Sequence, residues 1–471
     1  GYSTHSFFSP HPGYCRSPRE GTHRTDFRDM VKALHQAGIG VILDVVFNHT
    51  AEGGVGGPSI NFKGFGNETF YHLDSLDLSL YRDYTGCGNS VNANHPFVSR
   101  FILDCLEYWV REMHVDGFRF DLASELARGE DGSPMHNPPV LWGIELSDAL
   151  AGTKIIAEAW DAAGLYQVGT FPGYRWMEWN GRYRDSIRRF VRGDPGLIGE
   201  VATRLTGSSD LYEANLRLPI NSINFITCHD GFTLYDLVSY EQKHNAANGE
   251  DNRDGCDHNL SWNCGVEGET DDPQVLALRR GQAKIFMAVL FLSQGIPMLL
   301  AGDELLRTQR GNNNVWCQDN PLGWLDWNLM ERNQDMLRFV REMIAFRKRH
   351  PSLMRRRFLS GARKHGGDRF PDIQWHGQRL NEPKWDDPES RVLAFTLAAR
   401  TEGEEDIHAL LNMSAAPCEF EVPRLADRGW YLAVDTALAS PADIVPPDGQ
   451  TRVSQAPYAA APRSVVVLES R

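Results

Sequence analysis

The sequence predicts an α/β fold: a (β/α)8-type TIM barrel followed by a C-terminal antiparallel β-sandwich domain. Between about residues 24 and 354, helical patterns alternate with short apolar runs, as in a barrel built from βα units. Polar and charged residues end several of these runs, where a barrel carries its active site. After about residue 355 the helical pattern fades into short strand-like runs separated by turns. We therefore assign residues 1–354 to the barrel and residues 355–471 to the β domain.

The first αβ unit is clear from periodicity. Apolar residues recur at helical spacing from Phe27 to Leu34, Gly38 closes the segment, and the apolar run 41–49 follows. A second helix opens at Pro96 and leads into the run 117–123. Its expected apolar face consists of Phe97, Phe101, Cys105 and Trp109.

Four more strand-like runs follow in the barrel, and four lie beyond it. The barrel runs are 154–160, 173–179, 223–230 and 296–304, and those of the β domain are 391–399, 406–414, 430–436 and 464–470. Six barrel strands are two short of eight, and residues 1–10 are loop-like. We expect the first two barrel strands to be absent from this chain. Because an open barrel exposes edge strands, such a chain is expected to be poorly stable or to associate with something that covers the gap.

Composition excludes some classes of function. The formal charge of −14 argues against a nucleic-acid partner, and no apolar run reaches the roughly 20 residues that span a membrane. The longest run, 285–300, contains Gln294, Gly295 and Pro297 and predicts a buried helix followed by a strand. The eight cysteines form no CxxC pair and indicate reduced thiols in the cytoplasm.

The run 117–123 places an arginine and a carboxylate on one strand face. Alternation of side chains puts Arg119 and Asp121 together. A neighbouring positive charge keeps a carboxylate ionised, as a nucleophile requires. The same pair also fits a structural ion pair inside a barrel, and this strand alone leaves both interpretations open.

Carboxyl groups end two later runs. Glu158 has few polar neighbours in sequence, which favours a protonated general acid but also fits a buried structural glutamate. His229 and Asp230 end the run 223–230, where an Asp can bind two sugar hydroxyls more strongly as the ring flattens, although a His-Asp pair at a strand end also fits a structural role. Asp44 is expected to order the site, for instance by bonding Arg119, and His49 to reach a sugar hydroxyl.

These runs resemble a known family. The segments DVVFNH at 44–49, GFRFDLA at 117–123, IIAEAW at 155–160 and FITCHD at 225–230 are similar to the four sequence regions of the α-amylase superfamily of glycoside hydrolases. The resemblance narrows to the isoamylase and bacterial glycogen-debranching type in four further segments, 83–96, 178–194, 248–265 and 309–320.

The resemblance implies a role for each site residue. Asp121 would be the nucleophile, Glu158 the acid/base and Asp230 the transition-state stabiliser. Residues that would contact the nucleophile or the sugar next to the cleaved bond are Arg119, His49 and His229, with Tyr2 as a stacking platform. The run from Asn312 to Asn314 and Asp319 would bind the next sugar. The family normally carries an N-terminal β-sandwich module and two barrel strands before the point where this chain begins.

The expected function is hydrolysis of α-1,6 branch linkages in glycogen or limit dextrin by a retaining double displacement. Alternatives are a pullulanase-like or α-1,4-acting enzyme of the same superfamily, and an inactive glucan-binding fragment. The expected partner is an α-glucan polysaccharide, with no nucleic acid, membrane, cofactor or metal. The oligomeric state stays open.

Overall fold

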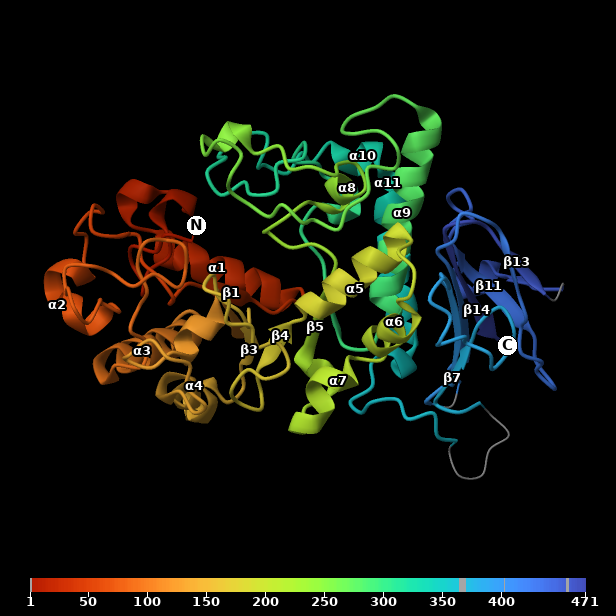
Figure 1. Ribbon diagram of the computed structural model, residues 1–471, viewed down its shortest axis with the longest axis horizontal. Coiled ribbons are helices and arrows are strands. Elements are labelled where there is room, and N and C mark those ends of the chain that lie inside the picture. The colour runs from red at the N-terminus through yellow and green to blue at the C-terminus, as the bar shows by residue number, and fades with distance from the viewer. Residues whose placement is uncertain (1, 364–369, 402, 455–456) are drawn as a thin grey trace. The chain divides into compact units, whose positions relative to one another are not determined.

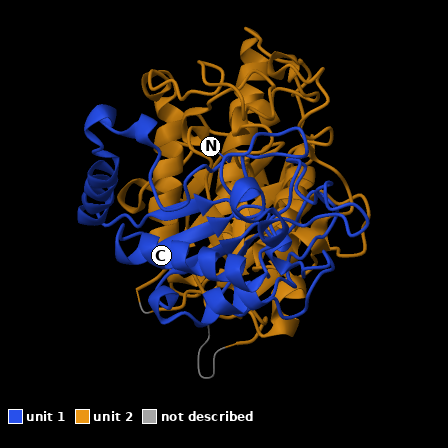
Figure 2. Cartoon of the chain, turned by 90° about the vertical axis from the view of Figure 1, so that its left-hand side faces the viewer, with its two compact units in different colours: residues 1–179 blue, residues 180–471 orange. Residues whose placement is uncertain are grey.

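The chain forms two compact units, Gly1–Trp179 and Asn180–Arg471 (Figure 2). The structure is a computed structural model that describes residues 2–363, 370–401, 403–454 and 457–471. Both the second half of the barrel and the β domain lie in the second unit, and the expected domain boundary after residue 354 stays a prediction.

The first unit contains four parallel strands in chain order, which Figure 1 labels in part. They are β1 (Ile42–Val45), β2 (Gly117–Phe120), β3 (Lys154–Ala157) and β4 (Met177–Trp179). The helices are α1 (His23–Gln36), α2 (Phe62–Phe70), α3 (Pro96–Arg111) and α4 (Pro139–Leu146). In the parallel register, Asp44 on β1 lies opposite Arg119 on β2, and Arg119 lies opposite Ile156 on β3. This register brings chemically active side chains from successive strands to one place.

The face of α3 differs from the expected one at its first turn. Phe97 is 76% exposed, whereas Cys105 and Trp109 are buried. The buried face is formed by Val98, Ile102, Cys105, Leu106 and Trp109. Pro96 sets the start of the helix, and the apolar stripe that faces the core begins one residue later than we expected, because Val98 takes the place of Phe97.

The second unit continues the alternation of helices and parallel strands. Strand β5 (Ser222–Phe225) pairs in parallel with β6 (Ile296–Met298). The helices are α5 (Gly181–Arg192), α6 (Ile198–Leu205), α7 (Ser209–Tyr212), α8 (Leu234–Leu237), α9 (Pro273–Leu292), α10 (Leu329–Arg332) and α11 (Gln334–Arg349). The expected buried helix and following strand are thus α9 and β6. Among the described residues, six strands pair in parallel, two fewer than in a complete barrel, so the chain forms a partial barrel.

The C-terminal part is antiparallel, as expected. Its larger sheet has six strands in the order β12-β11-β14-β9-β8-β7, and its smaller sheet pairs β10 with β13. The bounds are β7 (Ile373–His376), β8 (Val392–Leu397), β9 (Ile407–Asn412), β10 (Cys418–Phe420), β11 (Trp430–Asp435), β12 (Thr451–Arg452), β13 (Tyr458–Ala460) and β14 (Ser464–Ser470). Sequence reasoning missed β7, β10, β12 and β13, because such short strands carry little periodicity.

The larger sheet buries both of its faces. One face shares a core with the small sheet, in which Leu410, Phe420 and Val466 are fully buried. The other face packs with α9 and α11, and Phe286, Met343 and Val467 belong to one core. In Figure 1 these helices stand beside β14. No helix among the described residues is long and apolar enough to cross a membrane.

Candidate active site

Arg119 is the centre of a buried polar cluster in the first unit. It is 3% exposed, and its guanidinium lies 4.1 Å from the centre of the Trp179 ring. Nη1 donates to Asp44 Oδ1 at 2.7 Å and to Asp121 Oδ1 at 3.0 Å, and Nη2 donates to Glu158 Oε2 at 2.7 Å. The planar fork of an arginine suits this arrangement, because its donors point in fixed and different directions. One side chain therefore holds carboxylates from three strand ends.

Asp121 follows β2 directly and receives a second set of donors. Its backbone N–H donates to Val45 O at 3.0 Å, which ties it to the end of β1. The Asn48 amide donates to Asp121 Oδ2 at 2.9 Å and to Asp121 O at 2.8 Å. With an arginine on one oxygen and an amide on the other, the carboxylate is fixed in orientation.

His49 is oriented by the same asparagine. Because the Asn48 amide nitrogen donates to Asp121, its Oδ1 faces His49 Nδ1 as an acceptor at 2.5 Å, so Nδ1 carries the proton. Burial lowers the pKa of His49, against the opposing effect of Asp121. A neutral imidazole with a defined tautomer results.

Glu158 lies directly after β3, and the fold supplies polar partners that its neighbours in sequence lack. It is 3% exposed, and its Oε2 accepts from both Arg119 and the Leu122 N–H, the latter at 2.9 Å. Leu122 adopts a left-handed conformation with φ 38°, which is uncommon for a leucine. Sequence neighbours did not reveal these donors, because both come from the β2 end.

Tyr2 makes a specific contact with Asp44. Its hydroxyl donates to Asp44 Oδ2 at 2.5 Å, and its ring lies 6.0 Å from the Arg119 guanidinium. Burial, followed by the charge of Asp44, raises the pKa of Tyr2, so the phenol stays a neutral donor. The expected contact between Asp44 and Arg119 is present, and stacking of Tyr2 on a sugar stays a prediction.

His229 and Asp230 lie in the second unit, on the loop that follows β5. His229 Nε2 is 3.6 Å from Asp230 Oδ2, and the Asp230 side chain is 68% exposed. The loop is anchored at Gly231, whose N–H donates to Asn313 O at 2.9 Å. Asp230 therefore presents its carboxylate at the surface of a loop whose backbone is fixed.

Asn314 and Asp319 lie on the loop after β6, also in the second unit. The Asn314 amide donates to Asp254 Oδ2 at 2.9 Å, and its carbonyl accepts from Asn248 at 2.7 Å. Asp319 is exposed and accepts from the Trp324 indole N–H at 2.9 Å. Binding of a sugar by either residue stays a prediction.

Three functional groups were missed by sequence reasoning. Asn48 orients both Asp121 and His49, the Leu122 N–H bonds Glu158, and Trp179 covers the Arg119 guanidinium. Asn48 had a local signal, since it stands between a strand and a candidate histidine. The other two depend on how the strand ends meet.

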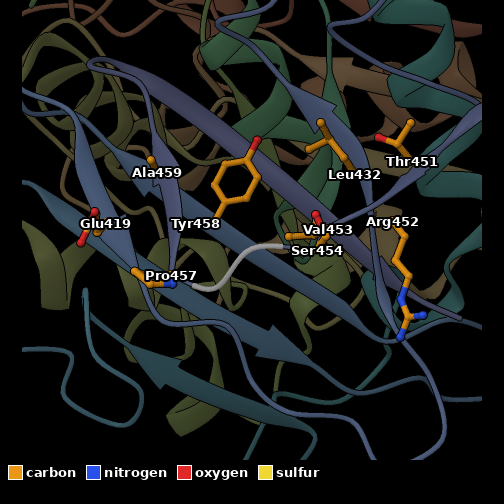
Figure 3. A pocket seen from close by; sticks show the side chains of 9 residues that line it. All are labelled: Glu419, Leu432, Thr451, Arg452, Val453, Ser454, Pro457, Tyr458 and Ala459. Atoms are coloured by element: carbon orange, nitrogen blue, oxygen red, sulfur yellow. The ribbon is translucent and has the colours of Figure 1, made fainter.

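A separate hollow lies in the C-terminal domain. It measures about 390 Å³ and is lined by residues of β10, β11, β12 and β13 and by the adjoining segments (Figure 3). Among its described lining residues only Glu419 carries a carboxylate, whereas glycoside hydrolysis uses a pair. We therefore place the candidate active site at the strand ends. The described residues contain no group of three or more His, Cys, Asp or Glu side chains arranged to hold a metal ion.

Comparisons with known proteins agree with the sequence pattern. Residues 80–356 match the model of the α-amylase catalytic domain, and residues 374–466 match that of the C-terminal domain of isoamylases 1–3. The chain is 52% identical over 405 residues to a glycogen operon protein GlgX homolog of Mycobacterium tuberculosis, covering 84% of this chain and 55% of the relative. It is 46% identical over 476 residues to isoamylase 3 of Oryza sativa subsp. japonica, covering 100% of this chain and 59% of the relative.

Solved structures show the same fold. A pullulanase from Bacillus acidopullulyticus matches with a TM-score of 0.73 and 23% identity, covering all of this chain and 51% of that one. The pullulanase of Bacillus subtilis, solved in complex with maltose, also matches with a TM-score of 0.73, and 59% of its chain is covered. The chain thus spans a little over half the length of the curated relatives it matches. Taken with the clustered strand-end carboxylates, these matches show that the chain belongs to the α-amylase family of glycoside hydrolases, and within it to the isoamylase and GlgX glycogen-debranching type.

Proposed function

We propose that this protein hydrolyses α-1,6 branch linkages of glycogen or limit dextrin by a retaining double displacement. The observation that carries the proposal is the buried bridge in which one guanidinium, that of Arg119, bonds both Asp121 and Glu158. Retaining glycosidases need two carboxyl groups about 5 Å apart, one as nucleophile and one as acid/base. Arg119 donates to both carboxyls from one guanidinium, which places them side by side and orients each of them.

Asp121 is the proposed nucleophile. Arg119 and Asn48 donate to different oxygens of its carboxylate, so both oxygens are held in place for attack on the anomeric carbon. Glu158 is the proposed acid/base, which gives its proton to the leaving oxygen and then takes one from water. In the free protein its Oε2 accepts from Arg119 and Leu122, so we infer that substrate binding changes these contacts before proton donation.

The remaining residues are proposed to bind the sugar. His49 and His229 would contact hydroxyls, Tyr2 would face the ring, and Asp230 would stabilise the flattened transition state. The chemistry at the reacting carbon does not distinguish α-1,6 from α-1,4 linkages. The assignment to branch linkages rests on the similarity to glycogen-debranching relatives, among them a glycogen debranching enzyme of Enterobacter that is 46% identical over 354 residues.

The proposed partner is a neutral α-glucan, and the proposed compartment is the cytoplasm. All eight cysteines are free thiols, as expected for a protein of a reducing compartment. Some of the structurally similar pullulanases were solved with maltose or maltohexaose bound. That similarity shows fold alone, and oligosaccharide binding by this chain is part of the proposal.

The test is release of reducing ends from glycogen by the 471-residue chain, with Asp121→Asn as the control. The substitution keeps the size of the side chain and removes the nucleophile. Activity in the parent and its loss in the variant support the proposal. Release from pullulan or from linear maltooligosaccharides in place of glycogen supports the pullulanase-like or α-1,4 alternative. Binding of glycogen with equal background rates in both proteins identifies a glucan-binding fragment.

A further inference from the structure

The loop that carries His229 and Asp230 is fastened at both ends by one buried side chain. Asp303 follows β6 and is fully buried. Its Oδ2 accepts from the Thr227 hydroxyl, at the last residue before the loop, and its Oδ1 accepts from the Leu234 N–H at 2.9 Å, where α8 begins. Residues 228–233 are therefore closed into a loop whose ends share one carboxyl group.

A second buried carboxyl makes the reciprocal connection. Asp236 on α8 accepts from the Thr308 hydroxyl at 2.5 Å and from the Gln309 N–H at 2.7 Å. Groups in the segment after β5 thus donate to Asp303, in the segment after β6. Groups in the segment after β6 in turn donate to Asp236, in the segment after β5. Burial raises the pKa of Asp303 to about 7, and the Thr227 hydroxyl and the Leu234 N–H oppose that rise. Such a desolvated group is costly unless it is hydrogen-bonded, so these contacts fix both segments firmly.

The loop tip is held from a third side. Gly231 has φ 106°, and its N–H donates to Asn313 O. Asn313 is itself immobilised, because its amide donates to Cys256 O at 2.7 Å and its N–H donates to Asn245 Oδ1 at 3.0 Å. The Asp230 side chain, 68% exposed, therefore extends from an anchored backbone.

We propose that Asp303 is a positioning residue for Asp230, holding its loop in the orientation that the transition state requires. The proposal rests on the proposed function of Asp230. Asp303 has no direct contact with the sugar in this scheme, because it is fully buried beneath the loop. Preorganisation of a charged group matters because misplacement by about 1 Å costs up to about a hundredfold in rate.

The first test needs no catalytic activity. Hydrogen exchange of the backbone amides of residues 228–236 is measured in the parent, in Thr227→Val, which removes only the hydroxyl, and in Thr227→Ser, which keeps it. Thr203→Val, on α6, controls for the same substitution elsewhere in the unit. We expect several-fold faster exchange in Thr227→Val alone, with α5 and α9 unchanged. We call the two hydrogen bonds that Asp303 accepts from Thr227 and Leu234 the clamp. Equal exchange rates in the parent and in Thr227→Val would show that the clamp does not fix the loop.

The second test asks whether the clamp acts through Asp230. With α-maltotriosyl fluoride, a substrate whose leaving group needs no protonation, Thr227→Val and Asp303→Leu should lower kcat by about tenfold to a hundredfold with little change in KM. Thr227→Ser should restore the rate. In an Asp230→Ala background the same substitutions should have no further effect, because residues that act as one unit are not additive.

The outcomes separate the two proposals. An equal loss of kcat in both backgrounds overturns positioning through Asp230, even if exchange shows the clamp. A parent chain without activity counts against the proposed function, and the exchange experiment still decides whether Asp303 fixes the loop. If Asp303→Leu does not fold, both tests are made with Thr227→Val alone, because that variant removes only the hydroxyl that donates to Asp303.

Discussion

At the scale of single residues, the candidate site depends on Arg119. Its fork reaches three carboxylates, and a lysine at this position would keep the charge but offer one compact ammonium group. We expect Arg119→Lys to lower kcat by about a hundredfold, because Asp121 and Glu158 lose their common orientation. Kinetics on glycogen measure the change in kcat, and a thermal melt measures the change in stability.

Arg128→Lys is the matched control, since Arg128 is also a buried arginine of the first unit and pairs with Asp161. A similar loss of stability with a much smaller loss of kcat is expected there. Equal losses of kcat in the two variants would show that Arg119 acts only on folding.

Asn48 gives a second prediction at this scale. Asn48→Ala removes the donor to Asp121 Oδ2 and the acceptor that fixes the His49 tautomer. We expect kcat to fall by about tenfold to a hundredfold, as for loss of one preorganised hydrogen-bond donor. Asn89→Ala, which removes another buried amide of this unit, should lower stability with a smaller effect on kcat. Unchanged kcat in Asn48→Ala would exclude a role in orientation.

At the scale of elements, a row of buried polar groups crosses β7, β8 and β9. Thr396 Oγ1 lies 3.0 Å from His376 Nε2 and 2.9 Å from His408 Nδ1. Burial lowers the pKa of His376 to about 4 and that of His408 to about 3. Both histidines fold in the neutral form, so protonation disfavours this part of the sheet.

The pH dependence of stability follows from that row. The pKa of a histidine in the unfolded chain is about 6.5. Between that pH and the lower pKa of each histidine in the folded state, the unfolded chain binds more protons than the folded chain does. Each histidine therefore removes about 1.4 kcal/mol of stability per pH unit as the pH falls through this window. His408→Gln should flatten the slope by that amount in urea unfolding at pH 7.5, 5.5 and 4.5. An unaltered slope would mean that His408 does not titrate on unfolding.

At the scale of the whole molecule, the β domain and the helices of the second unit are joined by buried charges. Lys284 on α9 donates to Asp443 Oδ2 at 2.6 Å, and Arg338 on α11 also bonds Asp443. Together with the shared core, these contacts indicate that the unit 180–471 unfolds as one block.

Breaking that connection should destabilise the block. Asp443→Ala leaves the buried Lys284 ammonium without its carboxylate, and we expect a loss of about 3 to 5 kcal/mol in the free energy of unfolding. The exposed Asp427→Ala should stay within about 0.5 kcal/mol of the parent. Denaturant unfolding followed by circular dichroism measures both. Separate transitions for the helices of the second unit and for the β domain would contradict a single cooperative block.

Sequence by itself determined the order of elements and the residue types at the strand ends. Period-two alternation placed Arg119 and Asp121 together, helical spacing located α1 and α3, and a long apolar run located α9. These are local properties, because each depends on residues a few positions apart. The short strands of the β domain gave no such signal, and the exposure of Phe97 depended on what α3 packs against.

Apart from the expected contact between Asp44 and Arg119, tertiary structure decided which distant groups meet. Arg119 bonds Glu158, 39 residues away, and Tyr2 bonds Asp44, 42 residues away. Asp303 bonds Thr227 and Leu234 across 76 and 69 residues. The physical reason is that parallel register and loop paths set these contacts, and neither is encoded by the spacing within one segment. The sequence therefore identified the charged groups. The fold determined that Asp121 and Glu158 share the Arg119 guanidinium, and that Asp303 bonds both ends of the loop that carries Asp230.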